Sequence, residues 1–169
     1  MLIIEDGTGK VDSNSYVSVD ELKAFATVRG LALPSDDMLE AGLISATDYL
    51  EIEECYKGKK TSSLQSLKWP RTGAYIDGDS FPTNSIPKAL KIAQIRLALE
   101  VFKGIDLMPT ISGSNEDYVI EETVGPITTK YADATDFSGT PTFTAVNGLL
   151  LPLIGRSCGG SGLLNVFRA

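Results

Sequence analysis

The chain has 169 residues, of which 43% are hydrophobic, and it carries a formal net charge of −7 with a sequence pI near 4.6. This length and apolar content suit one domain with a core of its own. The negative charge disfavours binding to nucleic acid over a broad surface, because neutralising phosphates requires a basic face. A local basic patch is still compatible with the composition.

The chain contains no histidine, which excludes a Ser-His-Asp triad and removes the usual general base and the commonest metal ligand. The two cysteines, Cys55 and Cys158, match no CxxC pattern, so they predict neither a zinc site nor a disulfide framework. We therefore expect no catalytic residue, no metal and no cofactor. An enzyme that uses Asp and Glu with a metal is a remaining alternative, but no converging ligand spacing supports it.

The N-terminal segment carries two weak motifs and no targeting signal. Gly7-Thr8-Gly9-Lys10 resembles a phosphate-binding loop, but the position of the required earlier glycine holds Ile4 and the residue after the lysine is Val11. A calcium loop is suggested equally weakly by the spacing of Asp6, Thr8, Lys10 and Asp12. A polar loop is the preferred interpretation. Since the start is not a signal peptide and no stretch reaches membrane-spanning length, we expect a soluble intracellular chain without membrane contact.

The hydrophobic pattern predicts a mainly α fold with four helices. Each opens at a hydroxyl-bearing residue that suits a helix N-terminus, and the first has a full capping box, Ser18-Val19-Asp20-Glu21. The third is apolar on all sides, which predicts the most buried helix. The expected starts are Ser18, Ser35, Ser85 and Thr140.

Residues 118–131, between the third and fourth helices, alternate as in a β-hairpin with its turn at Val124-Gly125-Pro126. A lone two-stranded ribbon is marginally stable, so the hairpin must contact its own helices or another subunit. The side chains expected at a subunit contact or facing a channel are Tyr118, Ile120, Glu122, Ile127, Thr129 and Tyr131.

Residues 57–71 form a basic loop that contains no acidic residue. Cations beside a stacking aromatic are what single-stranded nucleic acid requires, so this segment is the candidate nucleic-acid patch. Its members are Lys57, Lys59, Lys60, Lys68, Trp69 and Arg71. The preferred interpretation of Trp69 is nevertheless an anchor that fills an edge of the core.

The chain ends in a flexible Gly/Ser-rich linker and an apolar tail. The expected organisation is a helical domain at 1–155, with the hairpin inserted at 117–132, followed by the linker and tail at 156–169. The tail either folds back as an edge strand or adds to the sheet of a partner protein, and the glycine linker favours the second. The tail residues expected to dock are Leu163, Leu164, Asn165, Val166, Phe167 and Arg168.

Several short motifs, taken in order, resemble a set of tailed-bacteriophage proteins often labelled DnaT-like single-stranded DNA-binding proteins. The order of these motifs over more than a hundred residues carries the resemblance, because each is only moderately specific alone. They are Asn14-Ser15-Tyr16-Val17-Ser18, Ala46-Thr47-Asp48-Tyr49-Leu50, Tyr56-Lys57-Gly58-Lys59-Lys60, Leu67-Lys68-Trp69-Pro70-Arg71, Ile86-Pro87 and Glu122-Thr123-Val124-Gly125-Pro126-Ile127.

The plan of helices and hairpin is also similar to that of phage head-to-tail connector (adaptor) proteins, and an acidic chain suits a conduit for DNA better than a clamp. This resemblance implies a four-helix bundle-like connector fold with an extended C-terminal tail. It implies a structural protein of the virion neck, assembled in the host cytoplasm as a ring of twelve copies. Its partners would be the portal protein, the next neck or tail protein, and genomic DNA that passes without tight binding. The alternative is a replication accessory that binds single-stranded DNA through residues 57–71.

Overall fold

The computed structural model describes residues 1–52, 55–109, 121–124, 127–130 and 142–155. The chain divides into two units, one formed by Met1–Leu107 with Phe143–Ala169 and the other by Met108–Thr142. The helices, the small strand pairs of residues 59–80 and the whole basic segment belong to the first unit.

The described helices are α1 (Val19–Val28), α2 (Asp36–Ile52), α3 (Lys88–Phe102) and α4 (Thr144–Leu150), with a 3-10 turn, η2 (Leu151–Leu153), after α4. The capping box of α1 is confirmed: the Ser18 hydroxyl accepts from the Glu21 amide at 3.1 Å, and the Glu21 carboxylate accepts from the Ser18 amide at 2.9 Å. No helix in the described ranges is long and apolar enough to cross a membrane.

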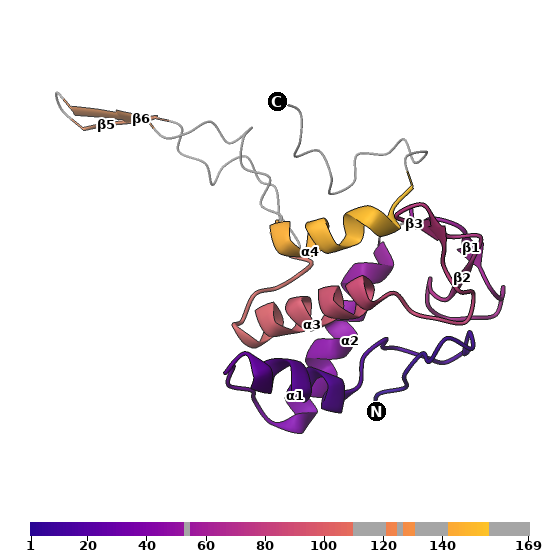
Figure 1. The fold of residues 1–169 in the computed structure, drawn as a ribbon. Coiled ribbons are helices and arrows are strands. Elements are labelled where there is room, and N and C mark those ends of the chain that lie inside the picture. Colours follow the sequence, from indigo (N-terminus) through magenta and orange to yellow (C-terminus); the bar gives the residue numbers. More distant parts are fainter. Residues whose placement is uncertain (53–54, 110–120, 125–126, 131–141, 156–169) are drawn as a thin grey trace. The chain divides into compact units, whose positions relative to one another are not determined.

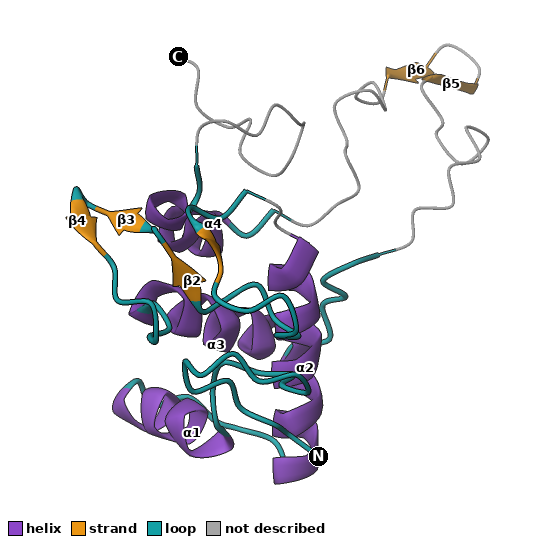
Figure 2. Ribbon diagram, turned by 90° about the vertical axis from the view of Figure 1, so that its right-hand side faces the viewer, coloured by secondary structure: helices purple, strands orange, loops and turns teal. Residues whose placement is uncertain are grey.

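Helix α3 lies between α1 and α4 and packs against both α2 and α4 (Figures 1 and 2). At its centre the buried Gln94 amide donates to the Ser15 hydroxyl at 2.7 Å, the Thr47 hydroxyl at 2.8 Å and the Leu43 carbonyl at 3.0 Å. Its oxygen accepts from the Tyr16 amide at 3.0 Å. Because a buried amide must be hydrogen-bonded, this one residue ties the N-terminal segment to α2 and α3.

The strands form three separate antiparallel pairs. Two pairs follow α2: β1 (Lys59–Lys60) with β2 (Arg71–Thr72), and β3 (Tyr75–Ile76) with β4 (Asp79–Ser80). Both views place β2 and β3 near the beginning of α3 (Figures 1 and 2). The third pair, β5 (Glu121–Val124) with β6 (Ile127–Lys130), belongs to the second unit.

The expectation of a four-helix bundle-like fold is wrong. Helices α1 and α4 have 10 and 7 residues against 17 in α2, so the four helices are too unequal to enclose a core along their lengths. The segment between α2 and α3 completes the core instead, by burying Leu67, Trp69 and Ala74. The basic loop is thus a folded part of the domain that contributes to its core.

A hairpin does occur between α3 and α4, with Val124 opposite Ile127 and Glu122 opposite Thr129. The expected contact residues Tyr118, Ile120 and Tyr131 lie outside the described residues, as do the linker and tail at 156–169. A contact role for the hairpin therefore stays a prediction, and so does docking by Leu163, Leu164, Asn165, Val166, Phe167 and Arg168.

Candidate nucleic-acid interface

Arg71 organises the basic segment from within. Its guanidinium donates to four backbone carbonyls, those of Lys57 at 2.7 Å, Gly58 at 2.7 Å, Lys68 at 3.1 Å and Tyr56 at 3.1 Å. A guanidinium has five N–H donors in a fixed fork, so four of the five are engaged by the backbone. Arg71 therefore fixes the shape of the segment, and little of its fork is left for a phosphate.

Trp69, also in the basic segment, is fully buried and anchors the segment to the core. Its ring meets those of Tyr56 and Phe81 edge to face, with centroids 6.1 Å and 5.7 Å apart. A ring without exposed surface cannot stack on a nucleobase. The interpretation of Trp69 as a core anchor is confirmed, and its place in the candidate patch is withdrawn.

Lys57 and Lys60 are also engaged with the backbone. The Lys57 amine donates to the Pro152 carbonyl at 2.8 Å, which ties the basic segment to η2. The Lys60 amine donates to the carbonyls of Gln65 and Ser66 at 3.3 Å and 3.4 Å. Carbonyls leave the ammonium charge uncompensated, so both lysines still contribute positive potential, and Lys60 does so from an exposed position.

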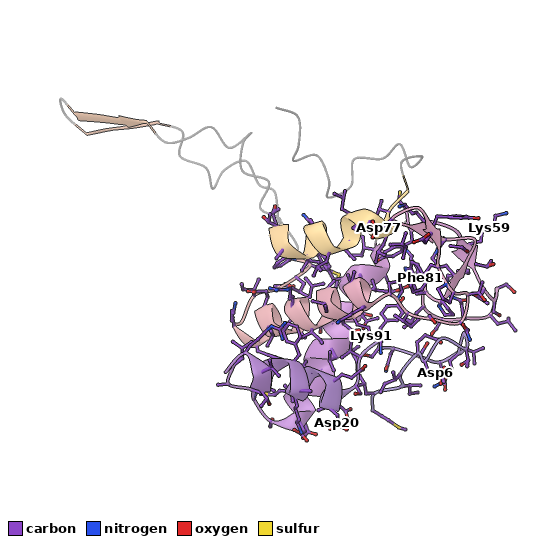
Figure 3. All side chains as sticks on the ribbon, in the orientation of Figure 1. Asp6, Asp20, Lys59, Asp77, Phe81 and Lys91 are labelled. Carbon is purple, nitrogen blue, oxygen red and sulfur yellow. The ribbon has the colours of Figure 1, made fainter. Side chains whose placement is uncertain are left out.

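Lys59 is the candidate residue that points most freely into solvent. It is exposed, lies opposite Thr72 in the β1–β2 pair, and sits at the outer edge of the domain (Figure 3). Within the described ranges its ammonium group has neither a hydrogen bond nor an ion pair. Residues 57–76 contain no acid, so the solvent-facing side of β1 and β2, called here the basic ribbon, is positive.

Tyr75 is a surface residue that the sequence interpretation missed. It begins the β3–β4 hairpin, which has a two-residue turn. The turn residues, Asp77 and Gly78, both have positive φ, at 54° and 94°. Two left-handed turn residues define the type I′ turn that tight hairpins favour, and an Asp-Gly pair is its strongest sequence signal. Ile76 packs against the core, whereas Tyr75 on the other face is 58% exposed. The Asp77-Gly78 pair could have revealed this hairpin.

One acid, Glu51 of α2, lies under the basic segment. Its carboxylate accepts hydrogen bonds from the Tyr16 hydroxyl and from the Lys68 amide, the latter at 2.8 Å, and Tyr16 in turn accepts from the Trp69 amide at 3.2 Å. Burial raises the pKa of Glu51 and, together with the nearby carboxylate, raises the pKa of Tyr16 well above its usual value. The network couples α2 to the base of the segment.

The raised pKa of Glu51 predicts a pH dependence of stability. The folded protein holds the Glu51 proton more tightly than the unfolded chain, so this residue's contribution to the free energy of unfolding falls as pH rises above 4.5, the ordinary value. Urea unfolding of the wild type and of Glu51→Gln from pH 4 to pH 7 isolates the effect, because the other carboxylates are common to both. As pH rises, the free energy of unfolding of the wild type should fall relative to that of Glu51→Gln. A difference that stays constant, or that grows in favour of the wild type, contradicts the raised pKa of Glu51.

The phosphate-loop motif of the N-terminus is occupied by the chain's own carboxylate. Fully buried Glu5 accepts from the amides of Gly7 and Gly9 at 2.9 Å each, from the Lys10 amide at 2.7 Å and from the Ser13 hydroxyl at 3.2 Å. These amides form a small anion-binding nest of the kind that otherwise cradles phosphate. Because the Glu5 carboxylate already fills this nest, the loop offers no phosphate-binding site.

The calcium-loop motif is likewise used internally. The Asp6 carboxylate accepts from the Thr8 hydroxyl at 2.6 Å and pairs with the Lys10 amine at 3.0 Å. The Thr8 hydrogen bond and then the Lys10 contact lower the pKa of Asp6 to about 2. In the part of the chain that the structure describes, no cluster of three His, Cys, Asp or Glu residues could hold a metal ion.

Cys55 is disulfide-bonded, although the spacing of the cysteines predicted no disulfide framework. The sequence spacing gave no indication, because the only other cysteine, Cys158, is far away along the chain. Cys158 lies outside the described residues.

The fold and site together define a small protein of helices and short antiparallel strand pairs that presents an exposed basic ribbon. The family described as "Putative DnaT-like ssDNA binding protein" matches residues 1–169, and the chain belongs to this family. No curated relative and no solved structure matches the chain.

The family match corrects the expectation of a phage head-to-tail connector, which is wrong. The motifs that suggested it are those of the DnaT-like set, whose label names single-stranded DNA, and the likeness to connectors rested on a plan of helices and hairpin that many small folds share. The ring of copies, the portal and neck partners and the virion location depended on that likeness, and no observation supports them.

Proposed function

We propose that this protein binds single-stranded DNA through the basic ribbon, with Lys59 and Lys60 contacting backbone phosphates. One observation carries the proposal: in a chain of this family, the acid-free segment is folded so that Lys59 and Lys60 are exposed to solvent. In this proposal the protein acts by binding and performs no chemistry.

The charge distribution supports a confined site. The basic segment holds five of the fifteen Lys and Arg residues, whereas all twenty-two Asp and Glu residues lie outside it. The remainder of the surface therefore repels a polyanion, and attraction is restricted to the ribbon. This resolves the conflict between a net charge of −7 and a DNA-binding role.

The frame beneath the ribbon supports the proposal in a second way. Arg71 and Trp69 hold the backbone of the segment in one conformation, through four carbonyls and two aromatic contacts. A binding surface that is already ordered loses less conformational entropy when its ligand arrives. Arg71 and Trp69 are therefore positioning residues for Lys59 and Lys60.

Replacing both exposed lysines tests the proposal. For Lys59→Ala combined with Lys60→Ala, we expect weaker binding to fluorescently labelled oligo(dT), measured by anisotropy between 50 and 200 mM NaCl. Each phosphate contact on a single strand contributes about 0.7 to the slope of log K against log salt, so the slope should fall by about 1.4. The single change Lys59→Glu should weaken binding without disturbing the fold, since this side chain has no contact to lose among the described residues.

A matched control removes the same number of positive charges from another part of the surface. Arg96 on α3 and Lys103, the C-cap of that helix, are exposed, and Lys103 pairs with Glu100 at the surface. Arg96→Ala with Lys103→Ala removes two positive charges outside the ribbon. We expect this variant to keep most of its affinity and its salt slope. Equal losses in the two double variants would show that binding follows overall charge and would overturn the assignment to the ribbon.

A further inference from the structure

We propose that Tyr75 is the base-stacking residue of this site, so that its ligand is a strand with unpaired nucleobases and not a duplex. This inference rests on the proposed function and adds to it the group that recognises the base. Among the aromatic side chains that the structure describes, Tyr75 alone is exposed, at 58%. It takes the role that the buried Trp69 cannot perform.

The backbone around Tyr75 presents its ring in a fixed direction. Tyr75 lies opposite Ser80 in the hairpin, and the Phe81 amide continues the pairing by donating to the carbonyl of buried Ala74 at 2.8 Å. The Phe81 ring rests on Trp69, and Ile76 packs against the core on the inner face. Since successive side chains of a strand alternate between faces, this anchoring holds Tyr75 outward.

Tyr75 lies on a backbone segment that adjoins the segment of the exposed Lys59. A Cβ built on Gly58 would lie 2.8 Å from the Ala74 nitrogen and 2.5 Å from the Thr72 oxygen, so Gly58 packs directly on the strand that leads into Tyr75. Because β1 and β2 are antiparallel, Lys59 lies opposite Thr72 on one side of this contact, and Tyr75 follows Ala74 on the other side. An ammonium group and an aromatic ring on adjoining backbone segments match the phosphate and base of a single strand, because every base offers a flat face for stacking.

Two acids limit the direction in which a strand can run. Asp77 and Asp79 are exposed at the tip of the same hairpin and, among the described residues, neither carboxylate pairs with a cation. Their charges repel phosphate beyond the turn, so the strand extends from Tyr75 toward Lys59. Asp77→Asn with Asp79→Asn should therefore tighten binding to oligo(dT). Asn tolerates the left-handed backbone of position 77 as well as Asp does, so the hairpin is retained.

The decisive experiment separates base contacts from phosphate contacts. Oligo(dT) and an abasic oligonucleotide of equal length carry the same phosphates, but only the first carries bases. Tyr75→Ala should weaken binding to oligo(dT) about 5- to 150-fold, the range that follows from the stacking energy of one base, and should leave the abasic strand unaffected. Tyr75→Phe should bind oligo(dT) as tightly as the wild type does, whereas Lys59→Glu should weaken binding to both strands.

Each outcome has a distinct meaning. If Tyr75→Ala binds oligo(dT) as the wild type does while the lysine variants lose affinity, the stacking assignment is wrong and the proposed function stands. Equal losses by Tyr75→Ala on oligo(dT) and on the abasic strand also overturn stacking, because they indicate a disturbed surface. If the wild type binds neither strand, the proposed function fails, and the stacking assignment fails with it.

Discussion

Replacing Trp69 by alanine is expected to lower the free energy of unfolding by about 3 to 5 kcal/mol, the usual cost of deleting a large buried aromatic ring. Trp69 is fully buried between Tyr56 and Phe81, and it joins the basic segment to the core. The cavity would also loosen the frame beneath Lys59 and Lys60. Urea unfolding followed by circular dichroism measures the effect.

Trp69→Phe distinguishes an anchor from a DNA-stacking residue. Phenylalanine keeps most of the buried ring and removes the indole N–H, which has no hydrogen-bond partner among the described residues. Part of the packing loss is thereby offset, because an unsatisfied buried donor is itself costly. We expect a much smaller loss of stability and unchanged affinity for oligo(dT). In the wild type, acrylamide should quench tryptophan fluorescence only weakly, and strong quenching would contradict the burial.

The second large effect is expected for Glu5→Ala, which should cost at least about 3 kcal/mol, since three backbone amides and one hydroxyl lose a charged acceptor in a buried place. The amides of Gly7, Gly9 and Lys10 all bond to Glu5, and both glycines have positive φ, at 105° and 76°, so the loop conformation depends on that carboxylate. Thermal and urea unfolding would register the loss.

Asp6→Asn is the matched control, because Asp6 is the adjacent acid on the same loop but is solvent-exposed. Its contacts are with Thr8 and Lys10 at the surface, where ion pairs contribute little. We expect almost no change in stability. If the two variants were equally stable, the account of Glu5 as the acceptor that organises the loop would be wrong.

Local features of the fold could be predicted from the sequence because they depend on neighbouring residues. The capping box of Ser18 and Glu21 needs only four residues, and it occurs as predicted. The hairpin with Val124 opposite Ile127 follows from an equally short pattern, whereas α3 begins at Lys88, three residues later than the expected start at Ser85. Helix α4 begins at Thr144, four residues later than the Thr140-Pro141 signal indicated.

The candidate site could be predicted only in part, because its organisation depends on contacts between distant residues. The run of charge at 57–71 was visible, but composition could not show that Arg71 turns inward to four carbonyls while Lys59 turns outward. The burial of Trp69 depends on Phe81 and on the core beneath it. Tyr75 differs, since the Asp77-Gly78 pair is a local sequence signal for the hairpin that exposes it.

The error about a connector has a physical cause as well. A net charge of −7 describes the whole surface, whereas recognition of a polyanion depends on local potential. The folded segment gathers its cations on one ribbon without any acid at 57–76, so the overall charge does not describe this surface.

Anisotropy of the wild-type protein with labelled oligo(dT), and with a duplex of the same length, is the most direct test of single-stranded DNA binding at the basic ribbon. We expect saturable binding to the single strand at 50 mM NaCl, a slope of log K against log salt of about −1.4 for two phosphate contacts, and weaker binding to the duplex. Failure to bind the single strand at 50 mM NaCl, or equal affinity for the duplex, would contradict it.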